Sequence, residues 1–203
     1  MKFSEVYRTL ESNNYYIFSI GDLSLFYPTE KDENLKKLIY RWKKKGWIHS
    51  LKRGLYELAY PREFMIPDVY VANKLYGPSY VSLETALSHY SIIPEISMAV
   101  TSITTKPTRR FKNKHGLFIY HTIGTDAFTG YLVENHRDFE VLIAEPEKAF
   151  IDYLYFRFHR PQKEFKFSGE RLDIDLIRKF DRRKVENYAK LFKINIGELY
   201  VNI

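Results

Sequence analysis

The sequence contains no cysteine, so the chain can form neither a disulfide bridge nor a thiolate metal site. It also has only nine glycines and eight prolines in 203 residues, too few for long disordered or low-complexity stretches. No apolar run reaches the roughly 18 residues of a membrane-spanning helix, and residues 1–10 are amphipathic rather than signal-like. These absences predict a folded protein of the reducing cytoplasm that neither spans a membrane nor is exported.

Hydrophobic residues make up 45% of the chain and aromatic residues 17%, which is enough apolar surface for one large core or two modest ones. The formal net charge of +7 is concentrated in a single segment. Residues 31–56 hold nine basic and two acidic side chains, so the rest of the chain is neutral overall. Such a concentrated positive field attracts a polyanion, either nucleic acid or an anionic membrane surface, although a solvated lysine-rich face is its commoner cause.

Hydrophobic spacing predicts three helices in the first part of the chain. Apolar side chains three and four positions apart indicate a helix over residues 1–13. Ser19 with Asp22 resembles a capping box at the start of a second helix, over residues 20–26. The third helix ends at Gly46, and its apolar stripe consists of Leu35, Leu38, Ile39 and Trp42.

A β-hairpin with a basic tip is predicted directly after the third helix. Two apolar-rich segments, residues 47–51 and 55–58, flank a glycine-containing turn with two cations at residues 52–54. Three helices followed by such a hairpin are the parts of a winged helix-turn-helix, whose third helix enters the major groove of DNA. We therefore predict a DNA-binding domain over residues 1–60, with a helix-hairpin module that docks onto another protein as the alternative.

The predicted DNA contacts lie at the hairpin tip and on the face of the third helix opposite its apolar stripe. Lysines there are expected to contact phosphates, whereas Arg41 has the planar guanidinium that can pair with guanine. Asp32 and Glu33 at the helix start favour its dipole but repel phosphates, so contact is expected from the middle of the helix and from the hairpin. The predicted interface residues are Lys36, Lys37, Tyr40, Arg41, Lys44, Lys52 and Arg53.

Residues 61–203 predict a second domain that mixes helices with a sheet. Helices are expected over residues 68–76, after Ser82, which is predicted to cap the helix that follows it, after Glu145-Pro146, and twice in the tail. Alternating β-branched and aromatic residues predict a small antiparallel sheet between residues 99 and 144. The chain is thus predicted to be an α+β protein, an N-terminal winged helix-turn-helix followed by a mixed helix and antiparallel-sheet domain.

A second basic cluster lies where two strands of that sheet are expected to turn. Charge at a strand edge commonly keeps the edge solvated and unpaired. The other two hypotheses are a docking surface for an acidic partner and a further contact with DNA phosphates. The predicted partner surface consists of Lys106, Arg109, Arg110 and Lys112, and the cluster continues to Lys114 and His115.

Sequence motifs for catalysis or for binding a metal or cofactor are absent. There is no glycine-rich phosphate loop, no nucleophile elbow and no zinc-protease motif. Asp173 and Asp175 resemble the paired acids of a nucleotidyltransferase, but the dipole of the helix that they begin is enough to explain them. We predict no catalytic residue, no metal and no cofactor. None of the six histidines has the spacing and carboxylate support of a metal site: His49, His89, His115, His121, His136 and His159.

Three segments carry a resemblance to a known family. They are residues 80–87 (YVSLETAL), residues 100–111 (VTSITTKPTRRF) and residues 144–150 (AEPEKAF), and they follow a hairpin tip, KRGLY, at residues 52–56. In these segments and in their order, the chain resembles the AbiEi antitoxins of bacterial abortive-infection toxin-antitoxin systems. The resemblance implies an N-terminal domain that represses its own operon at inverted repeats and a C-terminal domain that counters a cognate nucleotidyltransferase-like toxin.

The expected function is therefore binding, not catalysis, in two domains: residues 1–60 on operator DNA and residues 61–203 against the toxin. A winged-helix transcription factor whose second domain senses a ligand or dimerises is one alternative, and a neighbouring nucleotidyltransferase gene would distinguish the two. A nucleic-acid-processing enzyme is another alternative. It needs converging carboxylates, which the sequence does not provide.

Overall fold

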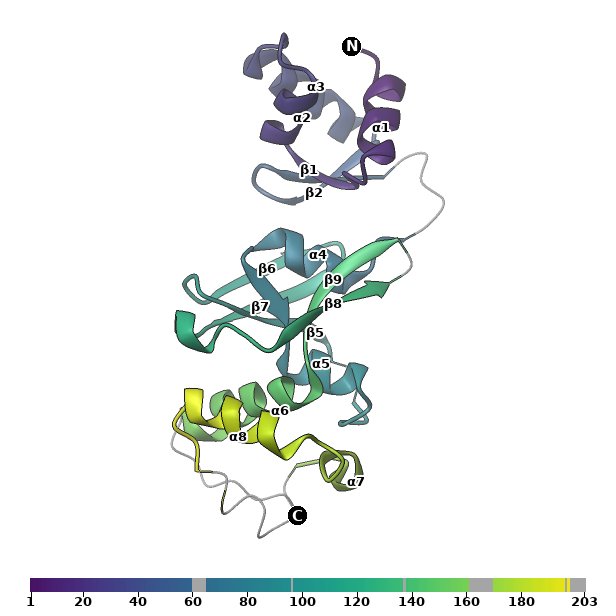
Figure 1. Ribbon diagram of the computed structural model, residues 1–203. Coiled ribbons are helices and arrows are strands. Elements are labelled where there is room, and N and C mark those ends of the chain that lie inside the picture. The colour runs from purple at the N-terminus through teal and green to yellow at the C-terminus, as the bar shows by residue number, and fades with distance from the viewer. Residues whose placement is uncertain (60–64, 96, 137, 161–169, 196, 198–203) are drawn as a thin grey trace. The chain divides into compact units, whose positions relative to one another are not determined.

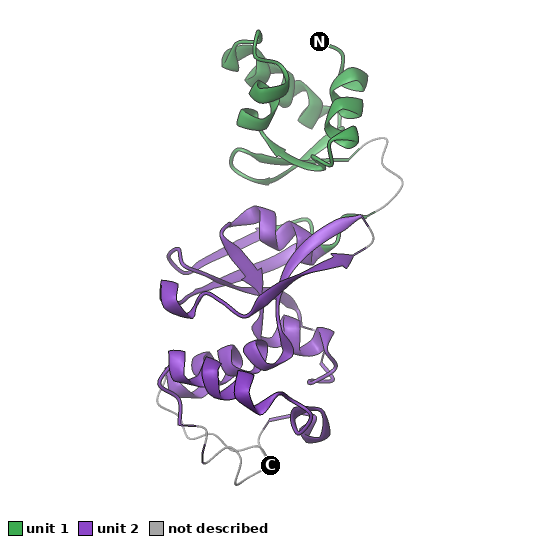
Figure 2. Cartoon of the chain, in the orientation of Figure 1, with its two compact units in different colours: residues 1–67, 113–115 green, residues 68–112, 116–203 purple. Residues whose placement is uncertain are grey.

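The computed structural model describes residues 1–59, 65–95, 97–136, 138–160, 170–195 and 197 (Figure 1). The chain divides into two compact units (Figure 2). Unit 1 comprises Met1–Pro67 and Asn113–His115, and unit 2 comprises Asp68–Lys112 and Gly116–Ile203. The predicted domain boundary, after residue 60, falls among residues 60–64, outside the described residues.

Unit 1 contains the three helices that the sequence predicts: α1 (Phe3–Ser12), α2 (Ile20–Phe26) and α3 (Asp32–Lys44). The capping box at the start of α2 is confirmed. Oγ of Ser19 accepts a hydrogen bond from the N–H of Asp22 at 3.2 Å, and the N–H of Ser19 donates to Oδ2 of Asp22 at 2.6 Å. The box therefore supplies partners for backbone donors that a helix start leaves unsatisfied.

Three strands complete unit 1: β1 (Ile17–Ser19), β2 (Ile48–Lys52) and β3 (Leu55–Leu58). β2 and β3 form the predicted hairpin, which turns through Gly54 at a φ of +79°. β1 pairs antiparallel with β3, so the sheet order is β1-β3-β2. The helices and the sheet enclose a core of Phe3, Val6, Tyr7, Leu10, Phe18, Leu23, Leu35, Leu38, Ile39, Trp42, Ile48 and Leu58.

Unit 2 is built on a six-stranded sheet in the order β6-β7-β5-β4-β9-β8 (Figure 1). The sheet is mixed, not antiparallel throughout as predicted. β4 pairs antiparallel with β5 and β8 with β9, whereas β5 runs parallel to β7 and β4 runs parallel to β9. β6 follows β5 in sequence but lies at the sheet edge, on the far side of β7. The neighbour of β5 is therefore β7, which runs in the same direction as β5. The strands are β4 (Ser79–Val81), β5 (Ala99–Thr104), β6 (Arg109–Asn113), β7 (Gly116–Thr122), β8 (Tyr131–His136) and β9 (Phe139–Ala144).

Helices pack on this sheet and on one another. α4 (Asp68–Leu75) contacts β4 and β9, and α5 (Leu83–His89) contacts β5 and α6 (Pro146–Leu154). Pro146 stands in the first turn of α6, as predicted, and α6 lies beside α8 (Arg182–Leu191) (Figure 1). The described residues also form the short helices η1 (Thr125–Ala127), η2 (Tyr155–His159) and α7 (Ile174–Ile177).

Both units combine helices with a sheet, and the chain is therefore an α+β protein, as the sequence predicts. Among the described residues, none of the helices has the length and apolar character needed to cross a bilayer.

Candidate nucleic-acid interface

The two faces of α3 differ in burial and in charge. The apolar stripe from Leu35 to Trp42 is buried in the core of unit 1. On the opposite face, 59% of the surface of Tyr40 is exposed, and a hollow of about 630 Å³ opens there. The hollow is lined by Lys36, Lys37, Tyr40 and Arg41, and Lys44 is exposed on the next turn. All the residues of this helix that the sequence assigns to DNA contact thus face solvent.

The cations on this face are not neutralised by carboxylates. Within the part of the chain that the structure describes, the side chains of Lys36, Lys37 and Arg41 make no hydrogen bond or ion pair. Nζ of Lys44 lies 5.0 Å from the centre of the Tyr40 ring, a cation–π distance that leaves the charge unpaired. The face therefore carries a positive potential that can attract a polyanion.

The acids at the start of α3 take the role that the helix dipole favours. Oδ1 of Asp32 accepts a hydrogen bond from Oγ of Ser24 at 3.2 Å, which ties the start of α3 to α2. Glu33 is exposed one residue later. Both acids lie in the first turn of α3, before the first lysine of the basic face.

The hairpin tip supplies two further cations. Lys52 ends β2 and is partly exposed, and Arg53 is exposed in the turn that follows. The pairing of β2 with β3 is irregular between Ser50 and Lys52, where Oγ of Ser50 donates to the carbonyl oxygen of Lys52 at 3.1 Å. Because β2 packs against α3, the hairpin and the basic helix belong to one module.

Three members of the second basic cluster lie on a strand, whereas Lys114 and His115 lie in a turn between two strands, as the sequence predicts. Arg109, Arg110 and Lys112 belong to β6, which stands at the edge of the sheet. Side chains alternate between the two faces of a strand, so Arg110 and Lys112 share one face. Arg109 lies on the other face with Phe111, whose ring centre is 5.8 Å from the Arg109 guanidinium. The predicted partner surface is therefore divided between two faces of the sheet.

The two ends of that cluster are engaged in the fold. Lys106 is exposed, but its Nζ donates to the carbonyl oxygen of Gly77. Lys114 and His115, which belong to unit 1, lie 3.1 and 2.7 Å from the carboxylate oxygens of the buried Glu57. Arg110 and Lys112 are thus the cluster's best candidates for contact with a partner.

Residues 80–87, 100–111 and 144–150 meet in a buried polar network of unit 2. Tyr80 and Ser82, from the first segment, donate to Oδ2 of Asp152 at 3.0 and 2.8 Å, and Lys148, from the third, forms an ion pair with Asp152. Thr101, from the second, donates to the carbonyl oxygen of Ser82 at 2.7 Å. The Ser82 hydroxyl therefore does not cap α5, contrary to the sequence prediction. These residues hold the fold together instead of lining an exposed site.

The acids considered as a nucleotidyltransferase pair stand at the start of α7. Oδ1 of Asp173 accepts a hydrogen bond from the N–H of Leu176 at 3.0 Å and caps the helix. Oδ1 of Asp175 lies 3.4 Å from the guanidinium of Arg178. Both acids thus lie at a helix start, where the helix dipole is enough to explain them, as the sequence analysis expects.

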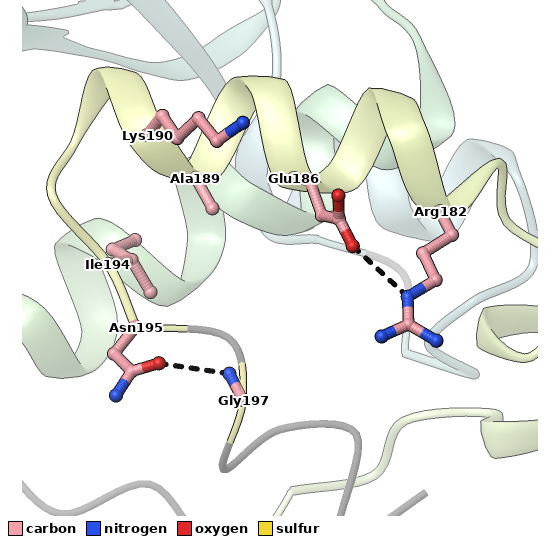
Figure 3. Close-up of a pocket in the computed structure, with 7 residues that line it drawn as sticks. All are labelled: Arg182, Glu186, Ala189, Lys190, Ile194, Asn195 and Gly197. Atoms are coloured by element: carbon pink, nitrogen blue, oxygen red, sulfur yellow. Dashed lines mark hydrogen bonds and ion pairs between the residues drawn. The ribbon is translucent and has the colours of Figure 1, made fainter.

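A second hollow, of about 360 Å³, lies beside α8 (Figure 3). Arg182 and Glu186 form an ion pair in its wall, with Nε 3.1 Å from Oε1. Opposite them, Oδ1 of Asn195 accepts a hydrogen bond from the N–H of Gly197 at 3.0 Å. The two charges of this pair offset each other, so the net charge of the lining comes from Lys190. The other lining residues of the hollow are Ala189, Lys190 and Ile194.

Among the described residues, the fold also assembles a cluster that sequence spacing does not reveal. His89, Glu134 and His136 offer three ligand atoms that lie within 4.8 Å of one another. His89 precedes Glu134 by 45 residues, so their proximity follows only from the packing of α5 beside the sheet.

No protein-family model matches the chain, and no curated protein matches it significantly.

Proposed function

We propose that unit 1 is a winged helix-turn-helix that binds duplex DNA. The observation that carries this proposal is the basic face of α3, whose cations Lys36, Lys37 and Arg41 are exposed and unpaired while the opposite face is buried. The order of three helices followed by the β2-β3 hairpin supports the same assignment. In this proposal α3 enters the major groove, Arg41 meets a base edge, and the lysines and the hairpin tip contact phosphates.

We further propose that the DNA is the operator of the chain's own promoter and that unit 2 counters a nucleotidyltransferase-like toxin in the cytoplasm. The support is the set of three segments at residues 80–87, 100–111 and 144–150, which keep the order found in the AbiEi family. The exposed Arg110 and Lys112 on β6 give unit 2 a surface for an acidic partner. Both activities are binding, so the protein acts without a catalytic residue.

The DNA proposal is tested with the full chain by fluorescence anisotropy, using a labelled duplex from the promoter upstream of its own gene. The logarithm of the affinity should fall linearly with the logarithm of salt concentration, because each neutralised phosphate releases counterions. Replacing Lys36 and Lys37 together by alanine should lower that slope by about 2. Replacing Lys179 and Lys190, two exposed lysines of unit 2, should leave it unchanged. Absence of binding at low salt, or an equal effect of the two pairs, would reject the proposal.

The antitoxin proposal is tested by co-expression with a nucleotidyltransferase-like gene adjacent to its own. The chain should restore growth to cells that express this gene, and a chain with the alanine pair at Lys36 and Lys37 should still do so. If growth is not restored while promoter binding persists, the protein is a DNA-binding regulator without antitoxin activity.

A further inference from the structure

A group of side chains with metal-ligand chemistry belongs to unit 2. His89 is the last residue of α5, and Glu134 and His136 stand two residues apart on β8. Residues two apart on a strand point to the same face, so Glu134 and His136 are presented together. The end of α5 brings the second imidazole to them.

The three ligand atoms converge on one small volume. Nε2 of His89 lies 2.9 Å from Oε2 of Glu134, and Nε2 of His136 lies 3.5 Å from the same oxygen. In a tetrahedral zinc site with ligands about 2.0–2.2 Å from the ion, neighbouring ligand atoms are about 3.3 Å apart. The two observed distances bracket that value, so small side-chain rotations are enough to admit an ion.

The Glu134 carboxylate also has a hydrogen-bond partner outside the cluster. The hydroxyl of Tyr90 lies 3.0 Å from Oε1 of Glu134 and 2.9 Å from the carbonyl oxygen of Ala144. Tyr90 thus fixes one oxygen of Glu134 and leaves the other directed at the imidazoles, as partners outside a metal site commonly do for its ligands.

We propose that His89, Glu134 and His136 form a binding site for a divalent first-row transition ion, with Zn²⁺ as the best-fitting ion. Two imidazole nitrogens and one carboxylate oxygen suit zinc and its neighbours, whereas magnesium and calcium favour sites made of oxygen. The three side chains are 35%, 26% and 28% exposed, which leaves a fourth coordination position for water or for a ligand from a partner. An ion here joins the end of α5 to β8, which stands at the sheet edge beside β9.

The test is a titration of the full chain with ZnCl₂ in competition with a chromophoric chelator. One Zn²⁺ should bind per chain, and His89→Gln or His136→Gln should lower the affinity by more than the about 10–100-fold that loss of a supporting partner costs. Tyr90→Phe should lower the zinc affinity by about 10–100-fold, because Tyr90 supports a ligand without being one. His159→Gln removes an exposed histidine outside the cluster and should leave the affinity unchanged, and MgCl₂ should not bind.

Two measurements on the parent chain keep the proposal testable if a variant fails to fold. Zinc should raise the melting temperature, because it binds the folded chain in preference to the unfolded one. It should also shift the imidazole NMR signals of two of the six histidines. Absence of zinc binding at micromolar concentration, or equal affinity in the parent and both glutamine variants, would show a hydrogen-bonded cluster only. Because DNA binding depends on α3, the zinc result and the DNA result can fail independently.

Discussion

Lys148 and Asp152 form an ion pair one turn apart on α6, and both side chains are fully buried. Burial raises the pKa of the Asp152 carboxyl and lowers that of the Lys148 ammonium, because each charge loses its water, and the attraction between the two opposes both shifts. The hydroxyls of Tyr80 and Ser82 also donate to the Asp152 carboxylate. The buried Asp152 carboxylate therefore depends on the Lys148 ammonium and on these two hydroxyls for its stabilisation.

Lys148→Met should destabilise the chain by about 3–5 kcal/mol, because it leaves the Asp152 carboxylate buried without a counter-charge. Urea unfolding followed by circular dichroism measures the loss. The double variant with Asp152→Asn removes both charges and keeps an oxygen for Tyr80 and Ser82, so it should lose less stability than the single variant. If the double variant loses the sum of the two single effects, the charges are not coupled.

The stability of unit 2 should also depend on the protonation of His121. Burial lowers the pKa of this imidazole, and the positive charges of Arg160 and Arg110 lower it further. The unfolded chain therefore binds the proton more readily than the folded chain, and the stability present above about pH 6.5 is lost as the pH falls through the lower folded value.

His121→Phe removes this titration and preserves an aromatic ring against Phe156, whose ring centre lies 4.8 Å from that of His121. Between about pH 7.5 and pH 5, the urea midpoint of the variant should fall less than that of the parent. The matched control is His159→Gln at an exposed position, which should keep the parental slope. Parallel slopes for the parent and His121→Phe would contradict the prediction.

Arg41 and Lys52 should affect DNA binding in different ways. Arg41→Ala should reduce the preference for the promoter duplex over a shuffled duplex by about 1–3 kcal/mol, since it removes a contact to a base edge. Lys52→Ala should weaken binding to both duplexes about equally, because a phosphate contact carries no sequence information. Anisotropy titrations with the two duplexes separate these outcomes. Equal losses on both duplexes for Arg41→Ala would make Arg41 a phosphate contact.

The elements that could be predicted from the sequence are those whose hydrophobic and charge pattern lies within a single short segment. α3 was predictable because a single helix contains both its buried stripe and its basic face, so rotation about one axis places Arg41. β1 and β4 are three residues long, too short for a period-two pattern to emerge. The sequence of β6 predicts a turn instead of a strand, because its arginines and lysine lack the apolar alternation of a half-buried strand.

The features that the sequence did not predict depend on packing between distant segments. Ser82 was a sound candidate for a helix cap, but Asp152, 70 residues later, competes for its hydroxyl. The cluster of His89, Glu134 and His136 likewise forms only when α5 packs beside the sheet. Parallel pairing of β5 with β7 depends on where β6 is placed, which the strand pattern alone does not fix.

The final prediction concerns Arg110 and Lys112, which share one exposed face of β6. Reversing both to glutamate should lower protection against the toxin in the co-expression assay by at least about tenfold, because repulsion across an interface with an acidic partner costs several kcal/mol. The fold should be little affected, since exposed charges at a strand edge contribute little to stability.

Arg109→Glu is the matched control, because Arg109 lies on the opposite face of the same strand. This variant also reverses a positive charge on β6, but it should preserve protection against the toxin. Thermal melts of both variants check that unit 2 remains folded. If the double variant melts like the parent and protects cells equally well, Arg110 and Lys112 only keep a sheet edge solvated, and the toxin contacts another surface. If Arg109→Glu alone abolishes protection, the partner approaches the face that holds Phe111 instead.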